Sequence, residues 1–124
     1  MKTILAVAAL LLFSPSSRAI YPQTGPDHGS IFGRVIDARN GEGLYSIQAF
    51  IVEGEIGTLS NRDGLFLLQG VPLGEATIRF QHHCFHSVTV KVQLTSEIRE
   101  RRIDVGMPYD VEQGSEKGCD RRIR

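Results

Sequence analysis

Residues 76–94 read ATIRFQHHCFHSVTVKVQL and contain two stretches in which apolar and polar side chains alternate. In the first stretch Ala76, Ile78 and Phe80 alternate with polar residues, and in the second stretch the valines at positions 88, 90 and 92 do the same. Successive side chains of a β-strand point to opposite faces, so a period of two indicates one buried and one solvated face. The segment therefore predicts two β-strands that line a hydrophobic core.

Further short runs rich in β-branched or aromatic residues are found at Ile31–Asp37, Ile47–Val52, Leu65–Leu68 and Ile103–Met107. Segments with Gly, Asn, Asp and Pro separate these runs, and such residues favour turns. No stretch shows a sustained helical repeat. The sequence thus predicts an all-β fold, a seven-stranded antiparallel β-sandwich. The residues expected in its core are Val35, Ala49, Ile51, Phe66, Ile78, Phe80, Val88, Val90 and Val92.

One of the turn segments, residues 61–64, also contains oxygen ligands. Asn61 and Asp63 are spaced like two ligands of a calcium loop, but no Glu follows at the distance that such a loop requires. The favoured interpretation is a tight turn in which Asp63 bonds the nearby backbone and Gly64 adopts a positive φ.

The first residues have the layout of a secretory signal peptide. Lys2 precedes an apolar run from Ile4 to Phe13, and small residues lead to a cleavage site after Ala19. The apolar run is about half the roughly 20 residues that a membrane-spanning helix needs, so no transmembrane segment is expected in the mature chain. We therefore expect a signal peptide over 1–19, an extended lead-in over 20–29, the sandwich over 30–107 and a flexible tail over 108–124.

The charge balance excludes a broad electrostatic attraction to nucleic acid. The chain carries 14 Lys plus Arg and 14 Asp plus Glu, and after loss of Lys2 and Arg18 its net charge is −2. A protein that binds nucleic acid without a dedicated site needs a basic surface, which this composition does not supply. We expect no nucleic-acid partner.

Two cysteines, Cys84 and Cys119, remain after removal of the signal peptide. Export would bring them to a compartment where disulfides persist, and each has one possible partner. A disulfide and a pair of free thiols both stay open, because the sequence does not give the distance between the two Cα atoms.

The segment His82-His83-Cys84-Phe85-His86 is the one local cluster with metal-ligand chemistry. If the segment is extended, His82, Cys84 and His86 point to one face, and three nitrogen and sulfur donors suit zinc or copper. The alternative is a polar strand edge with a disulfide cysteine in its middle. A disulfide and a metal site that includes Cys84 exclude each other, and no other cofactor is expected.

Several motifs together resemble a known family, the carboxypeptidase regulatory-like domain, which is a transthyretin-like or prealbumin-like β-sandwich. The matching segments are Gly33-Arg34-Val35-Ile36-Asp37 with a turn at Gly41, Ala49-Phe50-Ile51-Val52, residues 57–66 (GTLSNRDGLF), and Gly70-Val71-Pro72-Leu73-Gly74. Two positions depart from the family pattern: Asn61 stands where the family often has Asp, and Cys84-Phe85 stands where it has a Gly-aromatic pair.

The resemblance implies seven strands in two sheets and an exported bacterial setting, either beside carboxypeptidase domains, ahead of outer-membrane receptor plugs, or as free-standing domains. The resemblance implies no catalytic activity for the domain itself. The related transthyretin-like hydrolases of purine breakdown end in a Tyr-Arg-Gly-Ser tail, which this chain lacks.

The combined interpretation is an exported, non-catalytic accessory or binding domain in the periplasm, at the cell surface or outside the cell. It is expected to recognise a protein or glycan partner at the cell envelope, and protein is favoured because the chain has no Trp and only three Tyr. The alternatives are a metal-binding protein that uses His82–His86 and a purely structural spacer. We do not expect an enzyme.

Overall fold

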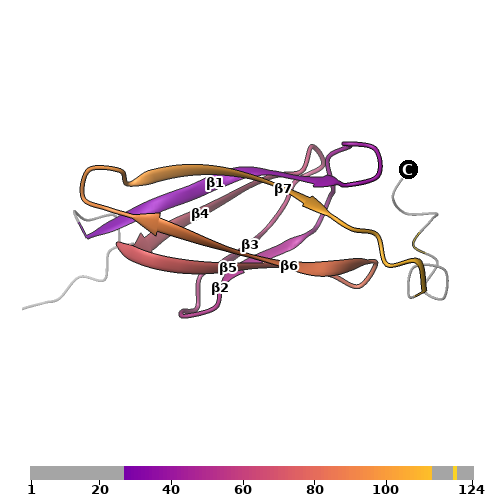
Figure 1. Ribbon diagram of the computed structural model, residues 1–124. Coiled ribbons are helices and arrows are strands. Elements are labelled where there is room, and N and C mark those ends of the chain that lie inside the picture. Colours follow the sequence, from indigo (N-terminus) through magenta and orange to yellow (C-terminus); the bar gives the residue numbers. More distant parts are fainter. Residues whose placement is uncertain (1–26, 113–118, 120–124) are drawn as a thin grey trace, which may run out of the picture.

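The computed structural model describes residues 27–112 and residue 119. They form a sandwich of two packed sheets (Figure 1). The seven strands are β1 (His28–Asp37), β2 (Gln48–Ile51), β3 (Gly57–Leu59), β4 (Leu65–Pro72), β5 (Gly74–His82), β6 (Phe85–Leu94) and β7 (Glu100–Met107). One sheet has the order β4-β1-β7 and the other has the order β3-β2-β5-β6. The predicted all-β sandwich is confirmed.

The core lies between the two sheets and is built from the inward-facing residues of every long strand. Seven of the nine residues predicted for the core are buried: Val35, Ala49, Ile51, Phe66, Ile78, Phe80 and Val92. Val88 and Val90 are only partly buried, because β6 is the edge strand of its sheet. At the centre the rings of Phe66 and Phe80 make an edge-to-face contact with centroids 5.2 Å apart, one ring from each sheet.

One pairing differs from the predicted antiparallel arrangement. β1 and β7 run parallel, in continuous register from Ser30 opposite Glu100 to Asp37 opposite Met107. Parallel strands need a long connection, and here almost the whole domain connects them. Among the described strands, β7 pairs with β1 alone and lies at the edge of its sheet.

The turn at residues 61–64 shows how short polar side chains define the loops. The Asn61 Oδ1 atom accepts hydrogen bonds from the backbone N–H groups of Asp63 and Leu65, both at 2.9 Å. Gly64 has a φ of 84°, which confirms the predicted tight turn, although Asn61 rather than Asp63 supplies the bond from the side chain.

The described residues cover the segment 30–107 expected for the sandwich and parts of the expected lead-in and tail. β1 begins at His28, two residues before the expected start of the sandwich. The expected signal peptide at 1–19 lies outside the described residues. Among the described residues, no helix has the length and apolar character needed to cross a bilayer.

Candidate functional site at the beta5-beta6 hairpin

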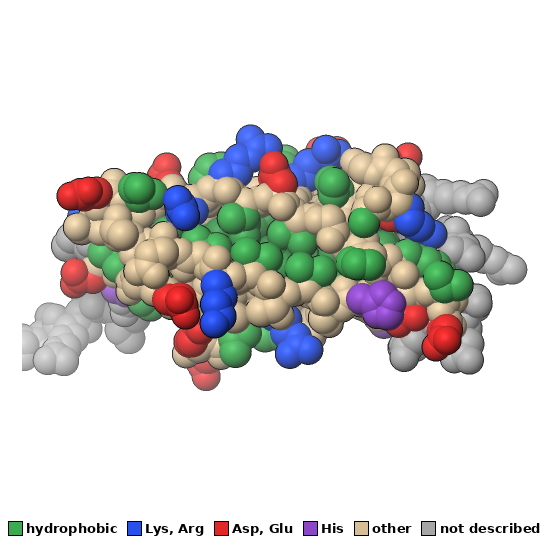
Figure 2. Space-filling model, in the orientation of Figure 1, with side chains coloured by type: hydrophobic (Ala, Val, Ile, Leu, Met, Phe, Trp, Pro, Cys, Tyr) green, Lys and Arg blue, Asp and Glu red, His purple; other side chains and the backbone are tan. Residues whose placement is uncertain are grey.

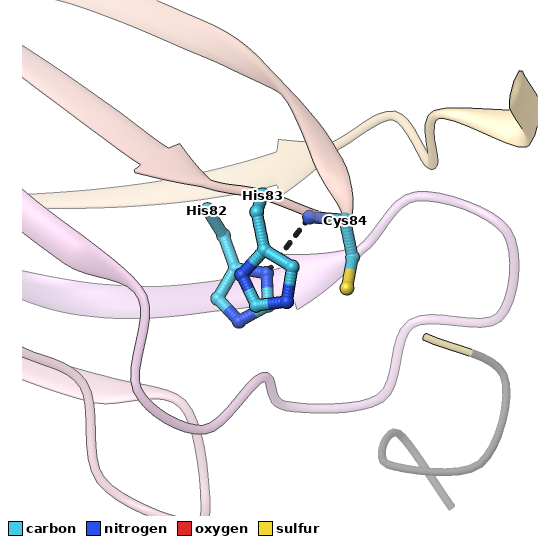
Figure 3. Close-up of side chains that lie close together, drawn as sticks. All are labelled: His82, His83 and Cys84. Atoms are coloured by element: carbon cyan, nitrogen blue, oxygen red, sulfur yellow. Dashed lines mark hydrogen bonds between the residues drawn. The ribbon is translucent and has the colours of Figure 1, made fainter. Parts of the chain in front are cut away.

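The segment His82–His86 forms the hairpin that connects β5 to β6 and is not one extended strand. β5 ends at His82, the chain turns at His83 and Cys84, and β6 begins at Phe85. The pairing of β5 with β6 shifts between Phe80 and His82, so the strand is irregular just before the turn. The Nδ1 atom of His82 accepts a hydrogen bond of 3.1 Å from the backbone N–H of Cys84 (Figure 3). This bond joins the last strand residue before the turn to the second residue of the turn.

Aromatic rings extend from this turn across the end of the sandwich. The imidazoles of His82 and His83 are stacked with centroids 4.4 Å apart, as Figure 3 shows. The ring of Phe85 makes edge contacts with His82 at 5.8 Å and with Tyr109 at 5.6 Å. The guanidinium of Arg39 lies 3.8 Å from the centroid of Tyr109, a distance typical of cation–π contacts. The hairpin is thereby linked to the loop that follows β1.

Arg39 is itself held by a buried carboxylate at the end of β1. The side chain of Asp37 is fully buried and accepts hydrogen bonds from the Arg39 Nη2 atom at 2.8 Å and from the Arg39 backbone N–H at 2.8 Å. Hydrogen bonds from the Arg39 side chain hold the pKa of Asp37 below its ordinary value, although burial of the carboxylate acts in the opposite direction. The charged form of Asp37 therefore fixes Arg39 over Tyr109.

The segment after β7 is bonded to the same hairpin. The backbone N–H of His86 donates to the carbonyl of Pro108 at 2.9 Å, and that of Asp110 donates to the carbonyl of Cys84 at 3.0 Å. Phe85 and Tyr109 form an isolated antiparallel bridge. Residues 108–110, which the sequence assigned to a flexible tail, thus add a short strand-like segment to β6. Their order comes from long-range backbone pairing that local composition does not reveal.

A disulfide fixes the hairpin a second time. Cys84 and Cys119 are bonded, with Cα atoms 5.7 Å apart and 35 residues of separation. Both cysteines are fully buried. The sequence left a disulfide and free thiols open, and the structure has the disulfide.

The metal-ligand set predicted from the sequence, His82, Cys84 and His86, requires an extended backbone. The structure has a turn at His83 and Cys84 instead. The potential ligand atoms of His82, His83 and Cys84 all lie within 4.8 Å of one another, so His83 takes the place expected for His86. The Nδ1 atom of His86 instead lies 3.8 Å from the Asp110 carboxylate. Because the Cys84 sulfur is in a disulfide, it is not a thiolate ligand, and metal binding stays a prediction for the reduced protein only.

Beside the stacked histidines the surface forms a groove with a volume of about 840 Å³. Its walls come from the loop 42–47, from Arg62 in the turn after β3, and from His82, His83 and Phe85. Tyr45 projects from the loop with 62% of its surface exposed, and the Arg62 guanidinium lies 5.9 Å from its ring centroid. A smaller hollow lined by Gln48, Leu59 and Gln81 shares Ser46 and both histidines with this groove. Figure 2 shows histidine side chains at this end of the molecule.

The loop that carries Tyr45 is held by one buried hydroxyl. The Ser60 Oγ atom accepts a hydrogen bond from the Ile47 backbone N–H at 2.8 Å and donates one to the Leu44 carbonyl at 2.6 Å. Ser46, between these two residues, has a φ of 65°, which few residues other than glycine adopt. The groove wall is therefore fixed in place before any ligand binds.

The acidic residues Glu53 and Glu55 are two positions apart in the sequence and lie outside this groove. Glu53 accepts a hydrogen bond from the Thr77 backbone N–H at 2.9 Å. Hydrogen bonding by the Thr77 side chain, and to a lesser extent by its backbone N–H, holds the pKa of Glu53 below its ordinary value, so Glu53 has a structural role at this turn.

The sequence of this chain matches the CarboxypepD_reg-like domain over residues 31–113, and the match includes the hairpin and the segment 108–110. The chain belongs to the CarboxypepD_reg-like domain family. The family match extends beyond Met107, the expected end of the domain, in agreement with the bonding of residues 108–110 to the hairpin. No relative was found among curated proteins.

Solved structures of bacterial proteins share the fold. A chain of a type II cohesin–X-dockerin complex from Acetivibrio cellulolyticus superposes with a TM-score of 0.54 at 13% identity, over 64% of this chain and 56% of that one. The major pilin subunit BcpA of Bacillus cereus has a TM-score of 0.54 at 12% identity, over 66% and 30% of the two chains. The pilus 2b backbone protein of group B streptococcus has a TM-score of 0.54 at 13% identity, over 68% and 42%. This chain matches about half or less of the length of these proteins, and at such identities the likeness shows the fold alone.

Proposed function

We propose that this chain is an exported, non-catalytic binding domain that recognises a protein partner at the cell envelope through the groove beside His82 and His83. The observation that carries the proposal is the composition of that groove, in which the exposed Tyr45 and Arg62 lie beside two stacked histidines and a loop of mixed polar and apolar residues. Tyrosine and arginine are over-represented among the residues that dominate protein–protein binding energy.

The rigidity of the groove supports the same proposal. One wall is held by the buried Ser60 hydroxyl, and the opposite wall is held by the disulfide at Cys84 and by the ring contacts of Phe85. A preformed site loses less conformational entropy on binding than a flexible one, so more of the contact energy remains as affinity.

A protein partner fits the groove better than a glycan does. Sugar rings stack on flat, exposed aromatic faces, and of the two benzene rings in the groove wall that of Tyr45 belongs to a residue that is 62% exposed and that of Phe85 to a residue that is 5% exposed. A purely structural spacer fits less well, because it has no use for exposed apolar side chains. Phe32, Leu65 and Leu67 are each exposed on the outer face of the sheet that contains β1.

We place this binding function outside the cytoplasm, after export of the chain. The signal-peptide pattern at 1–19 supports it, and so does the Cys84–Cys119 disulfide, because such bonds persist outside the cytoplasm. Periplasm, cell surface and extracellular medium are all compatible with these two observations.

The test uses the mature chain as bait for a displayed library of random peptides, alongside an array of oligosaccharides. Selected peptides should shift amide resonances of the loop 42–47, Arg62 and the hairpin, and Tyr45→Ala should weaken their binding by at least about 30-fold, as removal of a dominant contact does. Thr89→Ala, on the exposed outer face of β6, serves as the matched control and should change nothing. Selection of oligosaccharides but no peptides would contradict the proposal.

A further inference from the structure

β7 presents an open side that is regular enough to pair with another strand. It lies at the edge of its sheet and pairs with β1 without a register shift. The backbone N–H of Ser30 donates to the carbonyl of Arg99, and the backbone N–H of Ala38 donates to the carbonyl of Met107. Because backbone groups alternate in direction along a strand, the odd-numbered residues from 99 to 107 direct their carbonyls toward β1. The backbone groups of the even-numbered residues, Arg102 and Asp104 among them, therefore point to the open side. Across the described part of the chain, no strand occupies that side.

The other sheet edges carry features that hinder pairing. β3 has three residues only. β4 has an irregular register opposite Gly29–Ile31, contains Gly70 with a φ of 69°, and ends in Pro72. The start of β6 is already bonded to Pro108, and its exposed face carries Lys91. Short strands, irregular backbone, proline and charged side chains are the usual protections of an edge. β7 has no irregularity or proline but carries Glu100, Arg101, Arg102 and Asp104, so a pairing strand must present charges that match them.

The charges along β7 are complementary to the same strand turned end for end. Glu100, Arg102 and Asp104 share the outer face, and the Arg102 Nε atom lies 3.4 Å from the Asp104 Oδ1 atom. If two copies of β7 pair antiparallel about a two-fold axis at Ile103, Arg102 of each copy stands opposite Asp104 of the other. An axis at residue 102 or 104 would place identical charges opposite each other.

From this geometry we propose that the chain forms a two-fold symmetric dimer through antiparallel pairing of β7 with β7 of a second copy, centred on Ile103. The outward-pointing backbone groups of Arg102 and Asp104 then bond across the interface, and the sheet extends from three to six strands. The partner of this surface is a second copy of the chain itself.

The central residue of the pair supplies apolar contact. Ile103 is partly buried on the inner side of β7 and packs against the core. In the dimer it meets its own equivalent at a position where opposed side chains lie close together. Figure 2 shows hydrophobic side chains along the open edge between the two sheets, and Val88 and Val90 of the edge strand β6 are partly buried hydrophobic residues as well.

On the outer face the dimer would join two apolar patches. Phe32 is opposite Leu67 on one neighbouring strand and opposite Arg102 on the other, so the exposed ring lies beside the proposed interface. The combined face would carry two such patches related by symmetry. A dimer would also present two copies of the hairpin groove, which favours multivalent attachment.

The experiment measures the molar mass of the mature chain by sedimentation equilibrium at concentrations up to about 1 mM, which covers weak self-association. The wild type should dimerise. Arg102→Asp and Asp104→Arg should each raise the dimer dissociation constant by at least about 10-fold, because each substitution creates like charges opposite each other twice. The double variant R102D/D104R should dimerise again, and so should an equimolar mixture of the two single variants.

The matched control is Arg79→Asp, which makes the same charge change at an exposed position of β5 in the other sheet. It should leave the dissociation constant unchanged, and thermal melts should show that every variant folds. A monomeric wild type, a dimer insensitive to both single substitutions, or a double variant that stays monomeric would each overturn the proposal.

Discussion

Removal of the Cys84–Cys119 disulfide should cost this domain a large part of its stability. The bond closes a loop with a sequence separation of 35 residues. The chain-entropy relation assigns a loop of that length about 3.8 kcal/mol at 25 °C, through the freedom that the unfolded chain regains when the bond is absent. Domains of this size have a total unfolding free energy of only about 5–15 kcal/mol. Cys119→Ala should therefore destabilise the protein severely.

The assay is urea denaturation followed by circular dichroism. With a denaturant slope of about 1 kcal/mol per molar urea, the midpoint should fall by about 3–4 M. Cys84→Ala and the double variant should lose nearly the same free energy as Cys119→Ala, because either substitution opens the same loop. Wild-type protein treated with a thiol reductant is the control and should match the variants. A loss below about 1 kcal/mol, or additive losses from the two single variants, would refute the reasoning.

Three further predictions concern the core, the buried carboxylate and the hairpin. Phe80→Ala should lower the unfolding free energy by about 3–5 kcal/mol in urea melts, because the fully buried ring leaves a cavity between the sheets. The lowered pKa of Asp37 predicts stability that is present above its ordinary value of 3.8 and lost as the pH falls below it, so Asp37→Asn should flatten the unfolding free energy against pH in that acidic range. Cys119→Ala, which frees the Cys84 thiol, should bind zinc or copper in titration calorimetry, and His82→Ala should abolish the heat.

Each of these predictions has a matched control. Phe32→Ala, at a residue that is 37% exposed on the outer face, should lower the unfolding free energy much less than Phe80→Ala does. Asp63→Asn, at an exposed residue of the turn 61–64, is the matched control for Asp37→Asn. His86→Ala separates the ligand set of the folded hairpin from the set expected for an extended strand. Unchanged metal binding in that variant together with lost binding in His83→Ala would support the hairpin geometry.

The strands that the sequence predicted best are those whose alternation is local. Ala76, Ile78 and Phe80 of β5 face the core of the sandwich, as their spacing indicated. The turn before Leu65 forms at the predicted residues Asn61 and Gly64. Such features depend on a few neighbouring residues, and a single sequence therefore contains them.

The features that the sequence did not reveal depend on partners far along the chain. The parallel pairing of β7 with β1 joins residues about 70 positions apart, and the pairing of Tyr109 with Phe85 gives no periodic signal in so short a segment. The turn at His83 and Cys84 lacks the Gly or Asn that usually marks a hairpin, and so the segment was expected to be extended. The sequence did not reveal the groove either, because its residues Tyr45, Arg62 and His83 come from three separate loops that are far apart along the chain.

The most direct test of the proposed groove is site-specific photo-crosslinking in cells that produce the protein. A benzophenone amino acid at Tyr45 should give one discrete crosslinked species containing an envelope protein, and Arg62→Ala should remove that species because the neighbouring guanidinium is lost from the same site. The same probe at Thr89, on the exposed outer face of β6, should not form it. A recognition groove predicts this difference between the two positions. Identical crosslinks from both positions, or none from Tyr45, would contradict it.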